Sequence, residues 1–84
     1  MGLQQKVIRL LKESFEDVFT DTLEYVPTSR RVTGMIVSKS FNRLGHEARQ
    51  AKLDAVLRSG LTQEELARVG PIAVLTPNEA WTAI

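Results

Sequence analysis

The side chains best suited to chemistry in this chain are basic, and they are concentrated in its middle third. Residues 28–60 carry seven basic and two acidic side chains, whereas residues 1–27 and 61–84 each carry more acids than bases. Clustered guanidinium and ammonium groups attract phosphates and acidic protein surfaces. The segment therefore predicts a binding surface, although a charged run of this kind is also typical of a solvated face. The residues that would contact nucleic-acid phosphates are Arg30, Arg31, Lys39, Arg43, Arg49 and Lys52.

The residue types give little support to metal binding or covalent catalysis. His46 is the only histidine and there is no cysteine, so the chain lacks a thiolate or second imidazole to complete a metal site or a nucleophilic dyad. The adjacent acids Glu16-Asp17 and Glu64-Glu65 are expected on solvated helix surfaces, not in a pocket. Phosphate-binding loops, dinucleotide fingerprints and the GxSxG motif are missing. We therefore expect a protein that is not an enzyme and binds no metal alone, with His46 in a structural or a binding role.

Length and composition favour one small folded domain over residues 1–84. Of these residues, 43% are hydrophobic and 25% are charged, as in an ordinary globular protein. A chain of this size buries only about 60–65% of its unfolded surface, which leaves little room for a deep catalytic pocket. No apolar run reaches the roughly 18–20 residues of a membrane helix, so we expect a cytoplasmic protein with no membrane partner.

Apolar spacing in the first half of the chain predicts a helix followed by two strands. Apolar residues recur at steps of three and four over residues 3–19, which is the helical period. Residues 23–26 and 31–38 have the composition of short strands and are joined by a brief turn, so we expect them to be antiparallel. Gly34 inside the second strand indicates a bulge or a close helix contact.

The second half predicts two helices, one strand and a final turn. Phe41 is expected to pin down a loop before a helix over residues 46–59, which Gly60 would cap. Thr62 and Glu65 have the spacing of a capping box and would start a short helix ending near Val69, stopped by Gly70-Pro71. The remaining elements are a buried strand at residues 72–75 and a proline-led turn at residues 76–81.

This order of elements defines an α+β fold with two layers. The sequence reads helix, strand, strand, helix, short helix, strand, with a terminal turn. Because the last strand is reached through a helical crossover, we expect it to be parallel to the second strand. The prediction is a three-stranded mixed sheet with the helices on one face.

Several short motifs in this order are similar to those of the BolA family. Met35-Ile36-Val37-Ser38 followed by Phe41 resembles the family's strand that ends in serine and phenylalanine. Arg49, Leu53 and Leu57 fall at the family's spacings on its main helix, and Leu75-Thr76-Pro77 with Glu79 and Trp81 resembles its terminal run. The resemblance covers nearly the whole chain and implies a fold related to the type II KH arrangement.

The resemblance implies an adaptor that binds a monothiol glutaredoxin in iron–sulfur or redox-stress pathways. Family members use a histidine before the last strand, and a histidine or cysteine between the first two strands, to share an iron–sulfur cluster. Here the corresponding stretches, Arg68-Val69-Gly70-Pro71 and Pro27-Thr28-Ser29-Arg30, contain neither, and a guanidinium offers no lone pair to a metal. We therefore expect docking without a stably shared cluster. The expected partner-binding residues are Arg43, His46, Arg49 and Lys52.

The alternative is a nucleic-acid-binding regulator that uses the basic middle segment. A KH-type grip would need a GxxG loop between helices, but Gly45 and Gly60 are isolated and Gly70 precedes a proline. Binding would therefore depend on sequence-independent phosphate contacts, and its affinity would fall steeply with salt.

Overall fold

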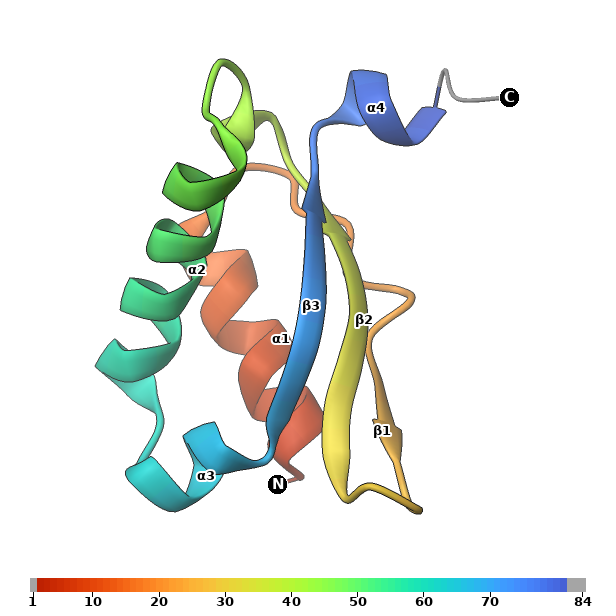
Figure 1. Ribbon diagram of the computed structural model, residues 1–84, viewed down its shortest axis with the longest axis vertical. Coiled ribbons are helices and arrows are strands. Elements are labelled where there is room, and N and C mark those ends of the chain that lie inside the picture. Colours follow the sequence, from red (N-terminus) through yellow and green to blue (C-terminus); the bar gives the residue numbers. More distant parts are fainter. Residues whose placement is uncertain (1, 82–84) are drawn as a thin grey trace.

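The helices and strands follow the predicted order (Figure 1). The computed structural model describes residues 2–81 of the predicted domain, so Met1 and residues 82–84 lie outside the described part. The α+β class is confirmed. The elements are α1 (Leu3–Ser14), β1 (Glu24–Val26), β2 (Arg31–Val37), the 3-10 helix η1 (Lys39–Phe41), α2 (His46–Gly60), α3 (Gln63–Ala67), β3 (Val69–Leu75) and α4 (Pro77–Trp81).

The three strands form one mixed sheet with β2 at its centre. β1 pairs antiparallel with β2, and Tyr25 lies opposite Val32. β3 pairs parallel with β2, and Ile36 lies opposite Val74. Both predicted strand directions are confirmed, and β1 and β3 form the two edges of the sheet.

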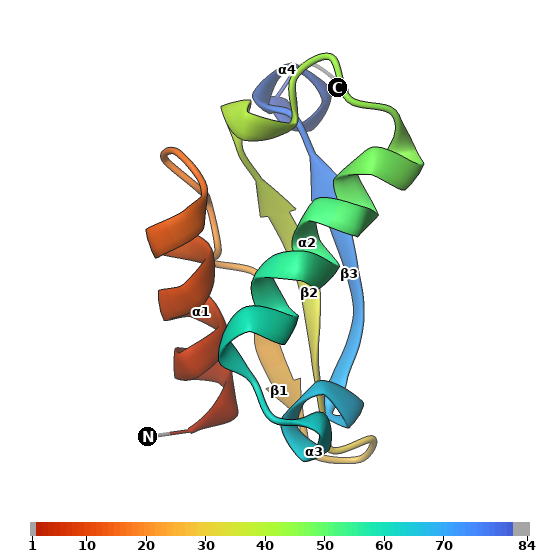
Figure 2. The same cartoon turned by 90° about the vertical axis from the view of Figure 1, so that its left-hand side faces the viewer.

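Helices α1 and α2 cover one face of this sheet, as two views at right angles show (Figures 1 and 2). The core lies between these layers, while α4 turns away from α1 and α2 at the ends of the strands. Within residues 2–81, no helix is long and apolar enough to cross a membrane. The buried core cluster comprises Val7, Leu11, Phe15, Val18, Leu23, Ile36, Phe41, Leu53, Leu57, Leu61, Ile72 and Val74.

The first helix ends at Ser14, so the predicted helix over residues 3–19 was wrong in its last turn. Phe15 is already extended, and Asp17 has a left-handed φ of 43° that turns the chain. Phe15 and Val18 are nevertheless buried, because the segment after the helix continues along the same core. Phe19 then forms an antiparallel bridge with Val37.

The last strand begins at Val69, so Gly70-Pro71 is part of the strand and the prediction of a start at residue 72 was wrong. The pairing steps from Val32–Val69 to Gly34–Ile72, which leaves one extra residue on β3. Such a bulge accepts proline, which has no N–H to give to the ladder. A side chain at Gly70 would lie 2.7 Å from Thr33 Cγ2.

The bulge expected at Gly34 is confirmed, because the register between β2 and β3 shifts between Val32 and Gly34. The alternative, a close helix contact, was wrong, because the close neighbour of Gly34 is the backbone before β1. Gly34 has φ +140°, and a Cβ there would lie 2.5 Å from the carbonyl oxygen of Thr22. Next to it, the Thr22 hydroxyl accepts from the Met35 N–H at 3.1 Å and donates to the Met35 carbonyl at 2.7 Å. The Thr22 side chain thus supplies to the Met35 backbone the two hydrogen bonds that a neighbouring strand would otherwise make with β2.

Gly60 belongs to α2 and does not cap it, which corrects the predicted helix end. The helix continues through Gly60, and the C-cap is Leu61 in an extended conformation. A Cβ at Gly60 would collide with the side chain of Leu10 on α1. The missing side chain therefore allows α1 and α2 to approach each other closely.

Candidate functional site

The start of α2 and the loop before it are held in place by a serine network and a buried phenylalanine. The Ser38 hydroxyl donates to the Glu16 carbonyl at 2.6 Å and accepts from the Ser40 N–H at 3.1 Å. Phe41 is fully buried, and its ring centroid lies 4.7 Å from that of Phe15. These contacts fix η1 against the segment that follows α1, and so position the residues on either side of Phe41.

Three of the four expected partner-binding residues are exposed around the first half of α2. Arg43 lies in the loop with a left-handed φ of 65°, His46 is the first residue of the helix, and Lys52 is on its outward side. On the opposite side of the helix, Leu53 and Leu57 are buried against the core. The helix therefore separates an apolar inner side from an exposed outer side of mixed charge, which carries Glu47, Lys52, Asp54 and Arg58.

Arg49 differs from the other three, because its side chain is engaged within the protein. It donates through Nε to the Leu44 carbonyl at 2.9 Å, and through Nη1 to the Val74 carbonyl at 3.3 Å and to Glu79 Oε1 at 2.6 Å. Only 13% of this side chain is exposed. Arg49 thus ties α2 to β3 and α4. Its neighbour Gln50 donates to the Ile72 carbonyl at 3.3 Å.

Glu79 completes this junction at the start of α4. Its carboxylate accepts from the Thr76 N–H at 2.8 Å, and the Thr76 hydroxyl accepts from the Glu79 N–H at 3.3 Å, which is a capping box. The hydrogen bond from Arg49, followed by that from the Thr76 backbone, lowers the pKa of Glu79 to about 2. The Trp81 indole packs edge-on against Phe19, with centroids 5.6 Å apart, and remains 56% exposed.

Acid should therefore release α4 when Glu79 takes up a proton. Because the folded pKa of Glu79 is about 2 and its ordinary value is 4.5, its contribution to stability is present above pH 4.5 and is lost as the pH falls toward 2. We expect the fluorescence of Trp81, the only tryptophan, to change over this range.

Since Arg49 is the largest cause of the lowered pKa of Glu79, Arg49→Met should raise this pKa, as measured by NMR titration of the Glu79 carboxyl carbon.

The matched control for this experiment is Arg58→Met, in the last turn of the same helix. It removes an exposed arginine and should leave the Glu79 titration unchanged. The carboxylate of Glu65 also has a lowered pKa, caused by the Thr62 backbone and by Lys6, so it must be followed as a separate resonance. An unchanged pKa of Glu79 in Arg49→Met would contradict the junction described above.

The set of residues expected to contact nucleic acid is divided between two ends of the molecule. Arg30 and Arg31 lie where β2 begins, whereas Lys39 and Arg43 follow its end (Figure 1). A seven-residue strand is about 23 Å long, so these groups do not form one continuous surface. Lys52 lies on the outward side of α2 and Arg49 is engaged as described.

Metal-ligating side chains are not gathered around His46. Among residues 2–81, no group of three or more His, Cys, Asp or Glu residues is arranged to hold a metal ion. His46 is exposed at the first turn of α2. Its exposed position is suited to contact with another molecule.

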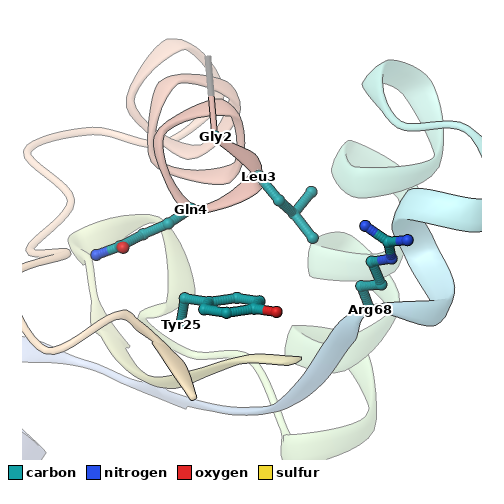
Figure 3. Close-up of a pocket in the computed structure, with 5 residues that line it drawn as sticks. All are labelled: Gly2, Leu3, Gln4, Tyr25 and Arg68. Atoms are coloured by element: carbon teal, nitrogen blue, oxygen red, sulfur yellow. The ribbon is translucent and has the colours of Figure 1, made fainter. Parts of the chain in front are cut away.

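Sequence reasoning missed a pocket of about 380 Å³ at the amino-terminal end of α1 (Figure 3). Its walls come from the start of α1, from β1 and from the residue before β3. Nothing in the sequence marked it, because Tyr25 read as an ordinary strand residue and Arg68 as part of a short helix. The residues that line it are Gly2, Leu3, Gln4, Tyr25 and Arg68.

Comparison with known proteins found no matching family model, no matching curated protein and no matching solved structure. The fold and the site geometry define a small α+β domain with an exposed helix face that carries both basic and acidic side chains. The BolA resemblance depends on the motifs quoted from the sequence.

Proposed function

We propose that this protein is a non-enzymatic, BolA-like adaptor of the cytoplasm that binds a monothiol glutaredoxin-type protein in iron–sulfur or redox-stress pathways. The observation that carries the proposal is the surface formed by the first half of α2 and the loop before it, where Arg43, His46 and Lys52 are exposed and no element of residues 2–81 buries them. A partner would dock on this exposed surface.

The outer side of α2 suits a protein partner because small residues lie between its charged ones. Ala48, Ala51 and Ala55 are exposed between the charged positions, so another backbone can approach the helix closely. Positive side chains at the rim of such a contact steer an acidic partner and increase the rate of association more than the final affinity. Within this surface Arg49 orients the helix, and contact with the partner comes from Arg43, His46 and Lys52.

In this proposal an iron–sulfur cluster stays with the partner. The β1–β2 turn, residues 27–30, and the segment leading into β3, residues 68–71, contain no imidazole or thiolate. A metal ligand must supply a lone pair, which the arginines in these segments do not have. The adaptor would therefore recognise the partner's protein surface and leave the cluster's coordination unchanged.

Chemical-shift mapping with a monothiol glutaredoxin, with and without its cluster, tests this function. We expect amide shifts at Arg43, His46 and Lys52 with either form. Reversing two charges in the double variant Arg43→Glu/Lys52→Glu should weaken binding by about tenfold or more. Arg58→Glu, in the last turn of α2, is the matched control and should have little effect.

Two results would contradict the proposal in different ways. If the partner causes no chemical-shift changes in α2, the partner does not dock on this helix. If a new absorption spectrum typical of a histidine-bound cluster appears, the chain supplies a ligand to the cluster. The nucleic-acid alternative is less favoured because its basic residues lie at two ends of the molecule. Single-stranded and duplex DNA at low salt should therefore bind weakly, without saturating shifts at Arg30 and Lys39 together.

A further inference from the structure

The pocket beside the start of α1 has an aromatic floor and a cationic wall (Figure 3). The Tyr25 side chain lies flat along one side, and Leu3 extends into the space across from it, with Arg68 at the far side. Tyr25 is 42% exposed, although it lies on the sheet face that α1 and α2 cover. The ring is exposed because it faces the pocket.

The polar groups around this pocket have hydrogen-bonding capacity that the fold does not use. Within residues 2–81, neither the Arg68 guanidinium nor the Tyr25 hydroxyl has a hydrogen bond or ion pair. Gln4 donates through Nε2 to the Leu23 carbonyl at 2.9 Å. This hydrogen bond fixes the orientation of the amide and leaves Oε1 as an acceptor. No acidic side chain lines the pocket, and Glu24 points to the opposite face of β1 because side chains alternate along a strand.

These groups together match a planar ring that carries an anionic group and an N–H donor. Rings stack on tyrosine and are also attracted to a nearby guanidinium. An arginine with no internal partner pairs well with a phosphate. The volume of about 380 Å³ is at the lower end of the range for small-ligand sites, roughly 300–1,000 Å³, which suits one nucleotide.

We propose that this pocket binds a nucleoside monophosphate whose base carries an exocyclic amino group. The base stacks on Tyr25 and packs against Leu3, its amino group donates to Gln4 Oε1, and its phosphate pairs with Arg68. This site is separate from the outward side of α2 and does not depend on the partner proposed above.

Titration of the ¹⁵N-labelled protein with adenosine monophosphate tests the site. We expect saturating shifts at Leu3, Gln4, Tyr25 and Arg68. Adenosine, which has no phosphate, and inorganic phosphate, which has no ring, should each bind at least about tenfold more weakly. Inosine monophosphate replaces the amino group with a carbonyl and should bind several-fold more weakly, because Gln4 Oε1 would face another acceptor.

Two variants separate the contributions of the ring and the charge. Arg68→Gln should weaken the binding of adenosine monophosphate by about tenfold and leave the binding of adenosine unchanged. Tyr25→Leu should weaken the binding of both ligands. Arg58→Gln, outside the pocket, is the control. Tyr25 and Arg68 are both exposed, and circular dichroism checks that each variant folds. Titration with a single-stranded oligonucleotide that carries a terminal phosphate shows whether the pocket binds the end of a nucleic-acid strand or only the free nucleotide.

Three outcomes would overturn the proposal. The first is the absence of saturating shifts up to about 10 mM nucleotide. The second is inorganic phosphate that binds as tightly as adenosine monophosphate, which would indicate a simple charge effect. The third is a set of shifts confined to the loop that contains Lys39 and Arg43.

Discussion

Gly34→Ala is expected to lower the free energy of unfolding by about 3 kcal/mol or more, a large part of the roughly 5–15 kcal/mol of a small domain. Two causes add at this position. A φ of +140° is strained for any residue with a Cβ, and that Cβ would lie 2.5 Å from the Thr22 carbonyl oxygen and 2.9 Å from the Leu23 Cα. Because both neighbours are backbone atoms, no side-chain rotation relieves the contact. Urea denaturation followed by circular dichroism measures the loss.

Gly45→Ala is the matched control for this substitution. A Cβ at Gly45 meets nothing within 4 Å, and its φ of −70° is accessible to alanine. Since alanine is a poorer N-cap than glycine, we expect a loss within about 1 kcal/mol. Equal losses of unfolding free energy in the two variants would show that the crowding at Gly34 does not destabilise the fold.

Phe41→Ala should cost about 3–5 kcal/mol, because it removes a fully buried ring and leaves a cavity. Phe41 has no exposed surface and packs on Phe15. It also anchors η1, so we expect the amide resonances of Lys39 and Arg43 to broaden or shift. Phe41→Leu retains most of the packing and should cost about 1–2 kcal/mol.

Thermal or urea unfolding measures the stability loss of the Phe41 variants, and titration with the partner shows whether partner binding is also weakened. If Phe41 positions the outward side of α2, Phe41→Leu should weaken partner binding less than Arg43→Glu/Lys52→Glu. A stability loss below about 1 kcal/mol in Phe41→Ala would contradict the buried position of the ring.

The sequence predicted those parts of the fold where local pattern and tertiary burial agree. The strand from Arg31 and the helix from His46 are examples, as is Phe41 in the core. The end of α1 was mispredicted because Phe15 and Val18 keep helical spacing while the chain between them turns at Asp17. A buried extended segment can have the same pattern of apolar residues as a helix, so periodicity alone does not separate them.

The candidate site was predictable only in part, because several of its contacts join residues far apart in the chain. Arg49 and Glu79 are thirty positions apart, and no local pattern shows that one would engage the other. The pocket beside Tyr25 depends on how the start of α1 approaches β1. Exposed positions such as His46 and Lys52 were easier to predict, since His46 is the first residue of α2 and Lys52 lies away from the line of Leu53 and Leu57.

The side chains of Arg49 and Gln50 have a consequence for how copies of this protein meet. Both donate to carbonyl groups of β3, at Val74 and Ile72, and β3 is an edge strand with no further strand beside it among residues 2–81. Unpaired edges invite strand addition and aggregation, and proteins commonly block them with charged or polar side chains. By occupying these acceptors, α2 discourages β3 from recruiting a strand of another molecule.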